Sequence, residues 1–244
     1  MLLAIDIGNS NIVLACVGDT IIKTSRINTH PFLQVHEYQK LFLDFMKDVN
    51  GVIVSSVVPS IDNTIKESIK NAYHQECMFV TPECSEIEVL LDNPSEIGSD
   101  LLTTAVGALA KYNHTSIIVD LGTATKFTAV TIDKKFLGGS IAPGIHSSFK
   151  SIFSSAEKLE EIEIIKPSKV VETSTLACIS SGMVFGYASM VDGMVERIKK
   201  EVPDALVILT GGLAPLIKEY LTIEYIYDEH ILIEGLKDLY LKNR

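Results

Sequence analysis

Short apolar runs separated by turn residues open the chain, and longer segments with helical spacing follow them. A short continuous or alternating apolar run is typical of a strand, whereas apolar residues at i, i+4 spacing are typical of a helix. In the first half the pattern predicts strands at residues 2–7, 12–17, 20–27, 51–58 and 78–80, and helices at residues 35–49, 61–73 and 98–112. This succession indicates a mixed sheet with helices on its faces.

The second half repeats the pattern of the first. Residues 116–123 match residues 2–10 in their order of apolar, acidic and glycine positions, and two further strand-like segments follow them. The remaining pattern predicts strands at 125–133, 135–141, 206–209 and 223–227, and helices after Gly144, at 174–200, after Gly212 and at 230–242. We therefore expect an α/β fold with two copies of one unit, an amino-terminal domain at 1–113 and a carboxy-terminal domain at 114–244.

Composition narrows the class of protein. The chain has 244 residues, of which 47% are apolar, so it can bury a proper core and is neither disordered nor fibrous. Its 21 Lys and Arg against 31 Asp and Glu give a formal net charge of −10. Nucleic-acid binding depends on neutralising phosphates, so we expect no nucleic-acid partner. An acid-rich run at 157–163 is most simply a solvated helix face.

The first residues and the four cysteines bear on the compartment. An acid already stands at Asp6, so the start of the chain lacks the regions of a signal peptide, and we expect a cytoplasmic protein. No uncharged apolar run reaches the ~18 residues of a membrane span, so no membrane partner is expected. The cysteines are scattered, which indicates thiols rather than a disulfide framework or a zinc site: Cys16, Cys77, Cys84 and Cys178.

A glycine turn after an acid-ended strand occurs twice. The two sequences are Asp6-Ile7-Gly8-Asn9-Ser10-Asn11 and Asp120-Leu121-Gly122-Thr123-Ala124-Thr125. Glycine permits a tight turn and a close backbone approach, so the N–H groups of such a hairpin can face a phosphate. Asp6 can hold Mg²⁺ through water. Either hairpin alone is explained equally well as a simple turn, but two in corresponding positions favour a nucleotide clamp.

A third glycine element follows an apolar run at residues 206–210. Gly211 and Gly212 would let an adenine or a ribose lie against the backbone, with a helix amino terminus available to an anion. A plain strand-to-helix turn explains this element equally well when it is taken alone. Together the three elements resemble those of the actin, hexokinase and Hsp70 superfamily, with two phosphate loops and an adenosine loop around an interdomain cleft.

Within that superfamily the chain resembles the type III pantothenate kinases from Met1 to about Tyr240. The resemblance rests on an ordered series of motifs at residues 6–11, 93–94, 98–100, 120–125, 138–144, 174–175, 181–182, 186, 191–193, 211–212 and 232–236. It implies duplicated ribonuclease H-like domains of the actin-like ATPase fold, with mixed β-sheets flanked by helices.

The resemblance also implies an activity, the ATP-dependent phosphorylation of pantothenate to 4'-phosphopantothenate, the first step of coenzyme A biosynthesis. Asp100 would then be the general base that takes the hydroxyl proton. A carboxylate at a helix amino terminus fits that role, because the helix dipole favours the anion. Without the resemblance, Asp100 would be interpreted as an ordinary helix cap.

Ligand contacts are implied residue by residue. The residues implied to bind the phosphates of ATP are Asp6, Ile7, Gly8, Asn9, Ser10, Asn11, Ile12 and Val13, with Mg²⁺ held by Asp6 through water. Further contacts with ATP are implied for Thr123, Gly211 and Gly212. The residues implied to bind pantothenate are Gly98, Ser99, Asp100, Leu101 and Thr175. Asp120 is expected to bind a monovalent cation, K⁺ or NH₄⁺. A homodimer with a shared active site is implied, and the apolar stripe expected to face the twin is Ile179, Met183, Gly186, Met190 and Met194.

Four positions depart from the usual family pattern. Leu101 stands where an Arg binds the substrate carboxylate, and Leu91 where an aromatic residue is expected. Lys126 replaces the usual Thr, and Thr128 the usual Asp. Lys126 is either a solvated strand residue or a source of positive charge in place of the missing Arg. Because of Leu101, a kinase of another small hydroxylated substrate stays open as an alternative. A second alternative, from a different class of function, is a catalytically weak regulatory or binding protein of the same fold.

Overall fold

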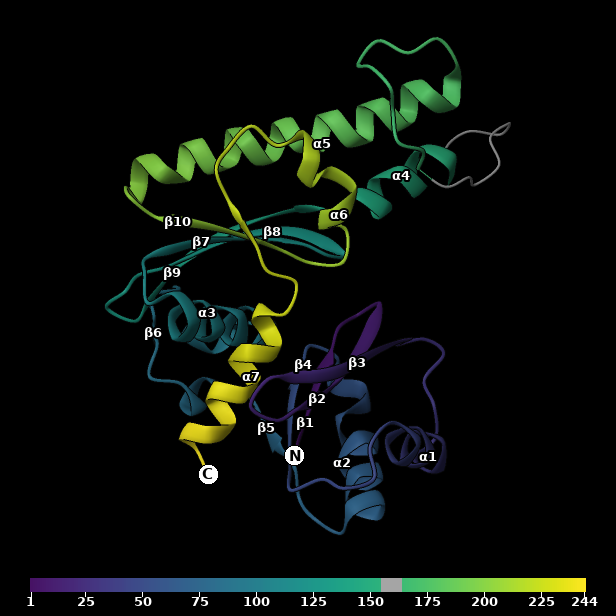
Figure 1. Cartoon of the computed structure of the whole chain (residues 1–244), viewed down its shortest axis with the longest axis vertical. Helices are drawn as coiled ribbons and strands as arrows, with labels where there is room; N and C mark the ends of the chain where they lie inside the picture. Colours follow the sequence, from purple (N-terminus) through teal and green to yellow (C-terminus); the bar gives the residue numbers. More distant parts are fainter. Residues whose placement is uncertain (155–163) are drawn as a thin grey trace. The chain divides into compact units, whose positions relative to one another are not determined.

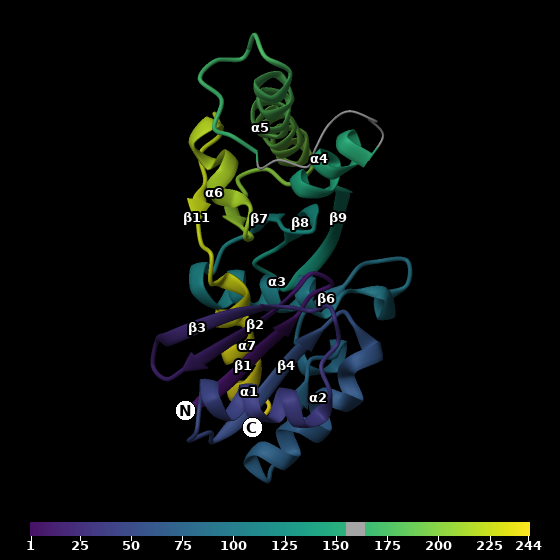
Figure 2. The same ribbon diagram turned by 90° about the vertical axis from the view of Figure 1, so that its right-hand side faces the viewer.

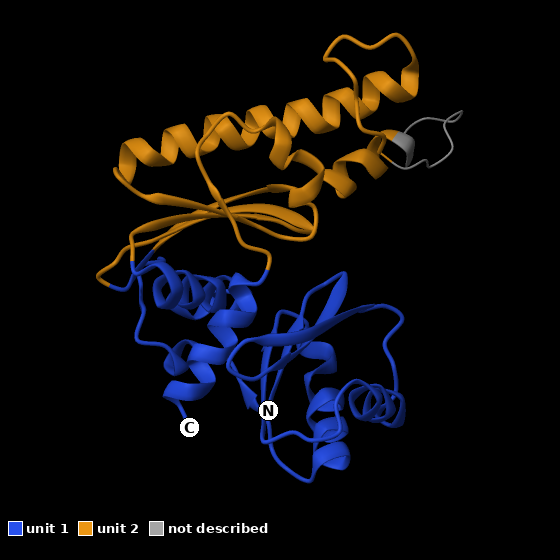
Figure 3. Ribbon diagram, viewed as in Figure 1, with its two compact units in different colours: residues 1–113, 134–136, 230–244 blue, residues 114–133, 137–229 orange. Residues whose placement is uncertain are grey.

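The computed structural model describes residues 1–154 and 164–244 of the chain. It contains two compact units, which Figure 3 colours separately. The first comprises Met1–Asn113, Lys134–Phe136 and His230–Arg244, and the second comprises His114–Asp133 and Leu137–Glu229. Contacts thus group the end of the chain with the first unit, whereas the sequence assigned it to a domain at 114–244.

A mixed sheet with the strand order β3-β2-β1-β4-β5 forms the centre of the first unit. Its strands are β1 (Leu2–Ile7), β2 (Asn11–Val17), β3 (Ile21–Asn28), β4 (Gly51–Ser56) and β5 (Met78–Phe79). β1, β2 and β3 are antiparallel neighbours, while β4 lies parallel to β1 and β5 parallel to β4. The mixed sheet predicted from the sequence is confirmed.

Two pairs of helices cover this sheet. α1 (Val35–Phe45) and α2 (Pro59–Tyr73) pack together against the core that the sheet forms on one face. α3 (Ser99–Tyr112) and α7 (Ile231–Lys242) lie side by side and both contact β4 (Figures 1 and 2). Helices therefore enclose the central strands of the first unit.

Residues of β4 alternate between the two faces of the sheet. Val52 and Val54 join the core that α1 and α2 cover. Gly51 and Ser55 lie on the opposite face. The place of a Cβ on Gly51 is filled by Tyr240 of α7, and the Ser55 hydroxyl contacts Ser99 of α3. The carboxyl end of β4 therefore turns a polar side chain toward the beginning of α3.

Two glycines allow α3 and α7 to approach closely. A Cβ atom on Gly107 of α3 would collide with the Ile231 carbonyl oxygen, and one on Gly235 of α7 would collide with the Thr103 carbonyl oxygen. Neither position accepts a larger residue unless a helix backbone moves. This contact fixes the last helix of the chain to α3.

The second sheet has the strand order β11-β10-β7-β8-β9-β6. Its strands are β6 (Glu88–Val89), β7 (Ser116–Leu121), β8 (Ala124–Val130), β9 (Lys135–Pro143), β10 (Leu206–Thr210) and β11 (Ile226–Tyr227). β6 and the first two residues of β9 group with the first unit. β7 pairs antiparallel with β8 and parallel with β10, the same arrangement that β1 has with β2 and β4.

Among the described residues of the second unit, the α-helices are α4 (Ile145–Ser154), α5 (Thr175–Glu201) and α6 (Ala214–Ile217). α5 is the long helix drawn in green along the second sheet in Figure 1. Its buried side chains share one face and pack on residues of β7 and β10: Val184, Tyr187, Val191 and Val195.

The apolar stripe expected to face a twin is partly used inside the unit. Met183, Met190 and Met194 pack, partly buried, against the same core as the valines of α5. Gly186 is exposed, and nothing lies within 4 Å of the place its Cβ would take. The methionines therefore contribute to the fold of the single chain.

Several predicted elements have different ends. The helix predicted to reach residue 49 stops at Phe45. Met46 and Val49, whose apolar spacing suggested a longer helix, also pack against the core, but from irregular backbone. The strand predicted at 223–227 is reduced to two residues. The acid-rich run at 157–163 lies outside the described residues. In the part of the chain that is described, no helix combines the length and apolar character needed to cross a bilayer.

Replacing Gly235 by Ala should destabilise the protein, because the added methyl group meets the Thr103 carbonyl oxygen. Overpacking of this kind costs about 1–3 kcal/mol, more than the ~1 kcal/mol that Ala gains over Gly inside a helix. Gly182→Ala is the matched control, since nothing lies within 4 Å of its Cβ position on α5, and it should be neutral or stabilising. Urea unfolding measures both; a Gly235→Ala variant as stable as the parent would contradict the close approach.

Candidate active site

The turn after β1 is closed by one backbone hydrogen bond. The Gly8 N–H donates to the Asn11 carbonyl oxygen at 2.9 Å. A Cβ on Gly8 would lie 3.2 Å from that oxygen, so a side chain here would crowd the turn. Asn9 and Ser10 are exposed at the tip, where their side chains can meet a ligand. The turn therefore has the form expected of a phosphate loop.

Thr29, which sequence reasoning missed, fastens this turn. Its N–H donates to the Ser10 carbonyl oxygen at 3.0 Å, and its hydroxyl donates to the Gly8 carbonyl oxygen at 2.7 Å. The residue is fully buried, so both bonds are shielded from water. Thr29 follows β3 in an ordinary polar stretch, and no local pattern marks it.

The carboxyl ends of β1 and β4 bring Asp6 and the start of α3 into one region. Asp6 pairs in register with Ser55, so the two side chains share a face of the sheet. The Ser55 hydroxyl lies 3.1 Å from the hydroxyl of Ser99, which donates to the Ser56 carbonyl oxygen at 2.8 Å. These bonds hold the first turn of α3, which contains Asp100, at the carboxyl end of β4, next to the end of β1 where Asp6 lies.

The Asp100 carboxylate lies over the first turn of α3. Its Oδ1 accepts a hydrogen bond from the Leu101 N–H at 2.8 Å. A Cβ on Gly98 would come within 2.5 Å of the same oxygen, so the glycine leaves the space that the carboxylate fills. The Thr104 hydroxyl donates to the Asp100 carbonyl oxygen at 2.7 Å. Asp100 is half-buried, so its carboxylate is oriented and still reachable.

The turn after β7 is one residue shorter than the turn after β1. The Ile7–Ile12 pair encloses four residues in the first unit, whereas the Leu121–Thr125 pair encloses three in the second. The sequence repeat therefore produces two related turns rather than two identical ones.

Residues at the start of α4 support this second turn. Gly144 lies so near that a Cβ there would collide with the Thr123 carbonyl oxygen, and the Ser147 hydroxyl donates to that oxygen at 3.2 Å. Sequence reasoning placed Gly144 in a motif without a role and missed Ser147. The Pro143-Gly144 break before a helix was the available signal, but it does not say which turn the helix supports.

The Asp120 carboxylate is enclosed by two separate segments. Gly211, at φ +95°, follows β10 and lies so near that a Cβ would be 2.5 Å from Asp120 Oδ1. A positive φ of this kind favours glycine. From β8, the Lys126 Nζ lies 3.0 Å from Oδ2. Two motifs that the sequence presented separately, the second turn and the glycine pair after β10, thus meet at Asp120.

Lys126 is not the solvated strand residue that one interpretation expected. Its side chain is 17% exposed and that of Asp120 is 27% exposed. The two residues stand directly opposite each other in the β7–β8 ladder, on the same face of the sheet. That interpretation is wrong, because the ammonium group is engaged with a carboxylate of the chain itself.

Two further predicted ligand residues lie in exposed positions, whereas Ile7 and Ile12 have their side chains in the core and could offer a ligand only their backbone. Thr175 is the exposed first residue of α5, and Gly212 is an exposed turn residue. α6, which follows Gly212, has only four residues, so it lacks the aligned peptide dipoles of a long helix. The expectation of an anion-binding helix terminus at this point stays a prediction.

The described residues hold their possible metal ligands and thiols in scattered positions. Residues 1–154 and 164–244 contain no group of three or more His, Cys, Asp or Glu side chains suited to a metal ion. Mg²⁺ held mainly by phosphates and water needs only one or two carboxylates, so the half-buried Asp6 fits that arrangement. The four cysteines are free, and burial raises the pKa of the Cys77 thiol to about 11, which keeps it protonated at neutral pH.

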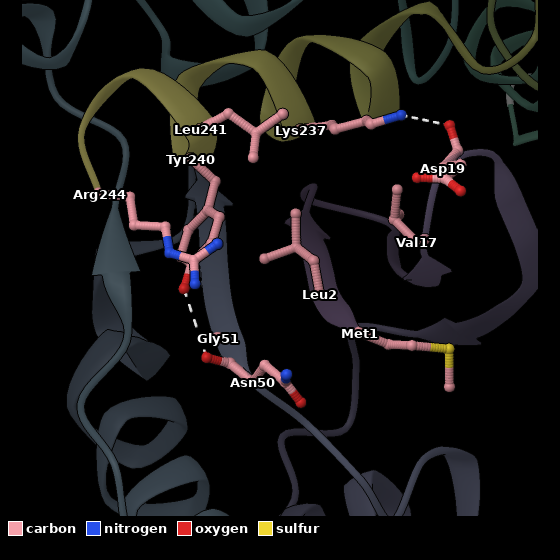
Figure 4. Close-up of a pocket in the computed structure, with 11 residues that line it drawn as sticks. Met1, Leu2, Val17, Asp19, Asn50, Gly51, Lys237, Tyr240, Leu241 and Arg244 are labelled. Atoms are coloured by element: carbon pink, nitrogen blue, oxygen red, sulfur yellow. Dashed lines mark hydrogen bonds between the residues drawn. The ribbon is translucent and has the colours of Figure 1, made fainter.

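A pocket of about 230 Å³ lies at the opposite end of the first sheet (Figure 4). Leu2 and Gly51, the first residues of β1 and β4, line it, and the Tyr240 hydroxyl donates to the Asn50 carbonyl oxygen at 3.5 Å at its side. Ligands of open α/β sheets bind at the carboxyl ends of strands. The candidate site is therefore the region of Asp6 and Asp100, not this pocket.

A comparison with protein families identifies the sequence. The family model described as type III pantothenate kinase matches residues 2–197. The chain belongs to the type III pantothenate kinase family. The matched range includes both glycine turns, α3 and most of α5, and it ends before Gly211 and Gly212.

Full-length relatives in the type III pantothenate kinase family agree with that assignment. The type III pantothenate kinase of Exiguobacterium sibiricum is 36% identical over the whole of both chains, and that of Halalkalibacterium halodurans is 38% identical over the whole of both chains. A solved structure described as a Baf family transcriptional activator from Campylobacter jejuni matches 99% of this chain and 98% of its own, with a TM-score of 0.62 and 19% identity. At that identity the similarity concerns the fold alone, and it confirms the actin-like ATPase fold.

Replacing Thr29 by Val should loosen the turn after β1, since the donor to the Gly8 carbonyl oxygen is lost while the volume is kept. Loss of one such bond costs about 1 kcal/mol. We expect the KM for ATP to rise roughly five-fold, with a smaller change in kcat. Thr29→Ser keeps the donor and should behave like the parent. Steady-state kinetics and urea unfolding test this; unchanged KM and unchanged stability in Thr29→Val would count against the role.

Proposed function

We propose that this chain transfers the γ-phosphoryl group of ATP to the primary hydroxyl of pantothenate, which yields 4'-phosphopantothenate and ADP, the first step of coenzyme A biosynthesis. Family membership supports the pair of substrates. The observation that carries the assignment of residues is the bonding of Ser99 to the end of β4, which holds the first turn of α3 at the strand edge of Asp6.

Asp100 is proposed as the general base. It accepts the hydroxyl proton of pantothenate while the hydroxyl oxygen forms its bond to the γ-phosphorus and ADP leaves. Phosphoryl transfer depends mainly on positioning and on neutralising charge. The Leu101 N–H that bonds Oδ1, and the glycine that leaves space for the carboxylate, support a fixed orientation of Asp100. Gly98, Ser99 and Thr175 are proposed to contact pantothenate.

The phosphates of ATP are proposed to bind the turn within residues 6–13 and Thr123. Backbone N–H groups and the exposed side chains of Asn9 and Ser10 supply donors there. Asp6 is proposed to hold Mg²⁺ through water, and bound Mg²⁺ would offset the charge of the phosphates. Gly211 and Gly212 are proposed to let the adenosine part of ATP lie against the backbone.

A homodimer with a shared active site is proposed from the resemblance to the family. The single chain already uses Met183, Met190 and Met194 for its own core, so a partner would meet the other face of α5. Analytical ultracentrifugation of the full chain tests this, and a mass of one chain at micromolar concentration would contradict it. The cytoplasmic location expected from the sequence stays a prediction.

The purified protein should convert pantothenate, with ATP and Mg²⁺, to phosphopantothenate detected by mass spectrometry. Asp100→Asn should lower kcat by about 10²–10⁴-fold while nucleotide binding persists, because an amide cannot take the proton. Asp62→Asn is the control, since Asp62 bonds the Ser56 hydroxyl on the opposite face of the sheet, and it should keep its activity. Full turnover by Asp100→Asn would refute the base, and absence of product with the parent protein would refute the proposed activity.

Leu101 brings no charge to the carboxylate of pantothenate. Leu101→Arg should lower the KM for pantothenate by about ten- to a hundred-fold, because a charge-assisted contact contributes about 1.5–3 kcal/mol. Pantothenol, which has a hydroxyl in place of the carboxylate, is the matched control ligand, and its KM should not change on the Leu101→Arg substitution. Leu101→Met controls for the change of side chain. An equal gain for both ligands, or none for either, would contradict this role of position 101.

A further inference from the structure

The ion pair between Lys126 and Asp120 is built into the ladder of the second sheet. Asp120 on β7 and Lys126 on β8 are direct antiparallel partners, and Nζ lies 3.0 Å from Oδ2. Both side chains are largely buried, with exposed fractions of 17% for Lys126 and 27% for Asp120. Because the ladder places the two residues directly opposite each other, their side chains are held close together by the backbone.

The neighbouring residue on the same face of β8 adds no charge. Thr128 stands two positions from Lys126, on the face of β8 that Asp120 shares. Lys126 is the one charged residue of β8, so this strand brings a single positive charge to Asp120.

The residues around Asp120 do not fit a separate monovalent metal cation. Oδ2 already faces the Lys126 ammonium group. Oδ1 faces the backbone at Gly211, where even a Cβ would lie only 2.5 Å away. A cation at this carboxylate would have to displace the lysine from a largely buried pair, which would leave a second positive charge beside it.

We propose that the Lys126 ammonium group takes the place of the monovalent cation at Asp120, so that nucleotide binding by this chain does not depend on K⁺ or NH₄⁺. An alkylammonium group has the charge of K⁺ and the donor chemistry of NH₄⁺, and the strand holds it permanently opposite the carboxylate. It neutralises Asp120 before a polyanionic ligand arrives, without capture of an ion from solution. The inference rests on the proposed function, because it takes Asp120 to lie near the bound nucleotide.

The experiment measures the binding of Mg²⁺ and a non-hydrolysable ATP analogue to the full chain by isothermal titration calorimetry. The salts are KCl, NH₄Cl and tetramethylammonium chloride at equal ionic strength. The parent protein should bind with a Kd that changes less than about two-fold among them. Lys126→Thr should bind roughly ten-fold more weakly in tetramethylammonium and regain affinity in K⁺ or NH₄⁺, as coupling between two bound ligands requires.

Two further variants keep the test interpretable. Lys126→Met keeps the length of the side chain without its charge, so it should show the same gain of K⁺ dependence if Lys126→Thr does not fold. Lys199→Thr removes an exposed lysine from the last turn of α5 and should leave the Kd independent of the salt. A crystal soak with Rb⁺ gives an independent readout, with anomalous scattering expected at Asp120 in Lys126→Thr and not in the parent.

The outcomes separate this inference from the proposed function. A parent protein whose nucleotide affinity rises ten-fold or more with K⁺ would overturn the inference and leave the kinase assignment intact. Equal affinities in all salts for both the parent and the Lys126 variants would also overturn it, since the lysine would then replace nothing. Failure of the parent to bind nucleotide in any salt would overturn the inference together with the proposed function.

Discussion

Each unit depends on one central strand that has an antiparallel neighbour on one side and a parallel neighbour on the other. β1 lies between β2 and β4, and β7 lies between β8 and β10. An antiparallel neighbour needs only a tight turn, whereas a parallel neighbour must return through a crossover. An aspartate near the end of such a strand therefore meets a glycine turn from one side and a distant part of the sequence from the other. Asp6 meets Ser55 in this way, and Asp120 meets Gly211.

The same position is electrostatically different in the two units. The antiparallel partner of Asp6 is Val13, which brings no charge, whereas the partner of Asp120 is Lys126. The ladder partner of Asp120 thus forms an ion pair with it, which the ladder partner of Asp6 cannot do. A chain with a net charge of −10 can therefore bind an anionic nucleotide, because the residues at individual strand ends determine the charge near the ligand.

Local sequence patterns were sufficient to predict most of the fold and part of the candidate site. Strands 2–7 and 116–121, and the turns that follow them, were predictable because alternation and glycine act over a few residues. Thr29 and Ser147 were not, because each supports a turn that is distant in sequence and carries no mark of its own. The last helix was assigned to the second half for a similar reason, since Gly235 meets α3 only in the folded chain.

The length of the second turn explains why the role of Lys126 was also hidden. With three enclosed residues, Asp120 faces Lys126, but with the four residues of the first turn it would face Phe127. A shift of one residue would turn Lys126 to the other face of the sheet, where the apolar core lies. The lysine is therefore compatible with the fold only in combination with the shorter turn. Turn length and the charged residue together determine the electrostatics at Asp120, and neither one indicates it alone.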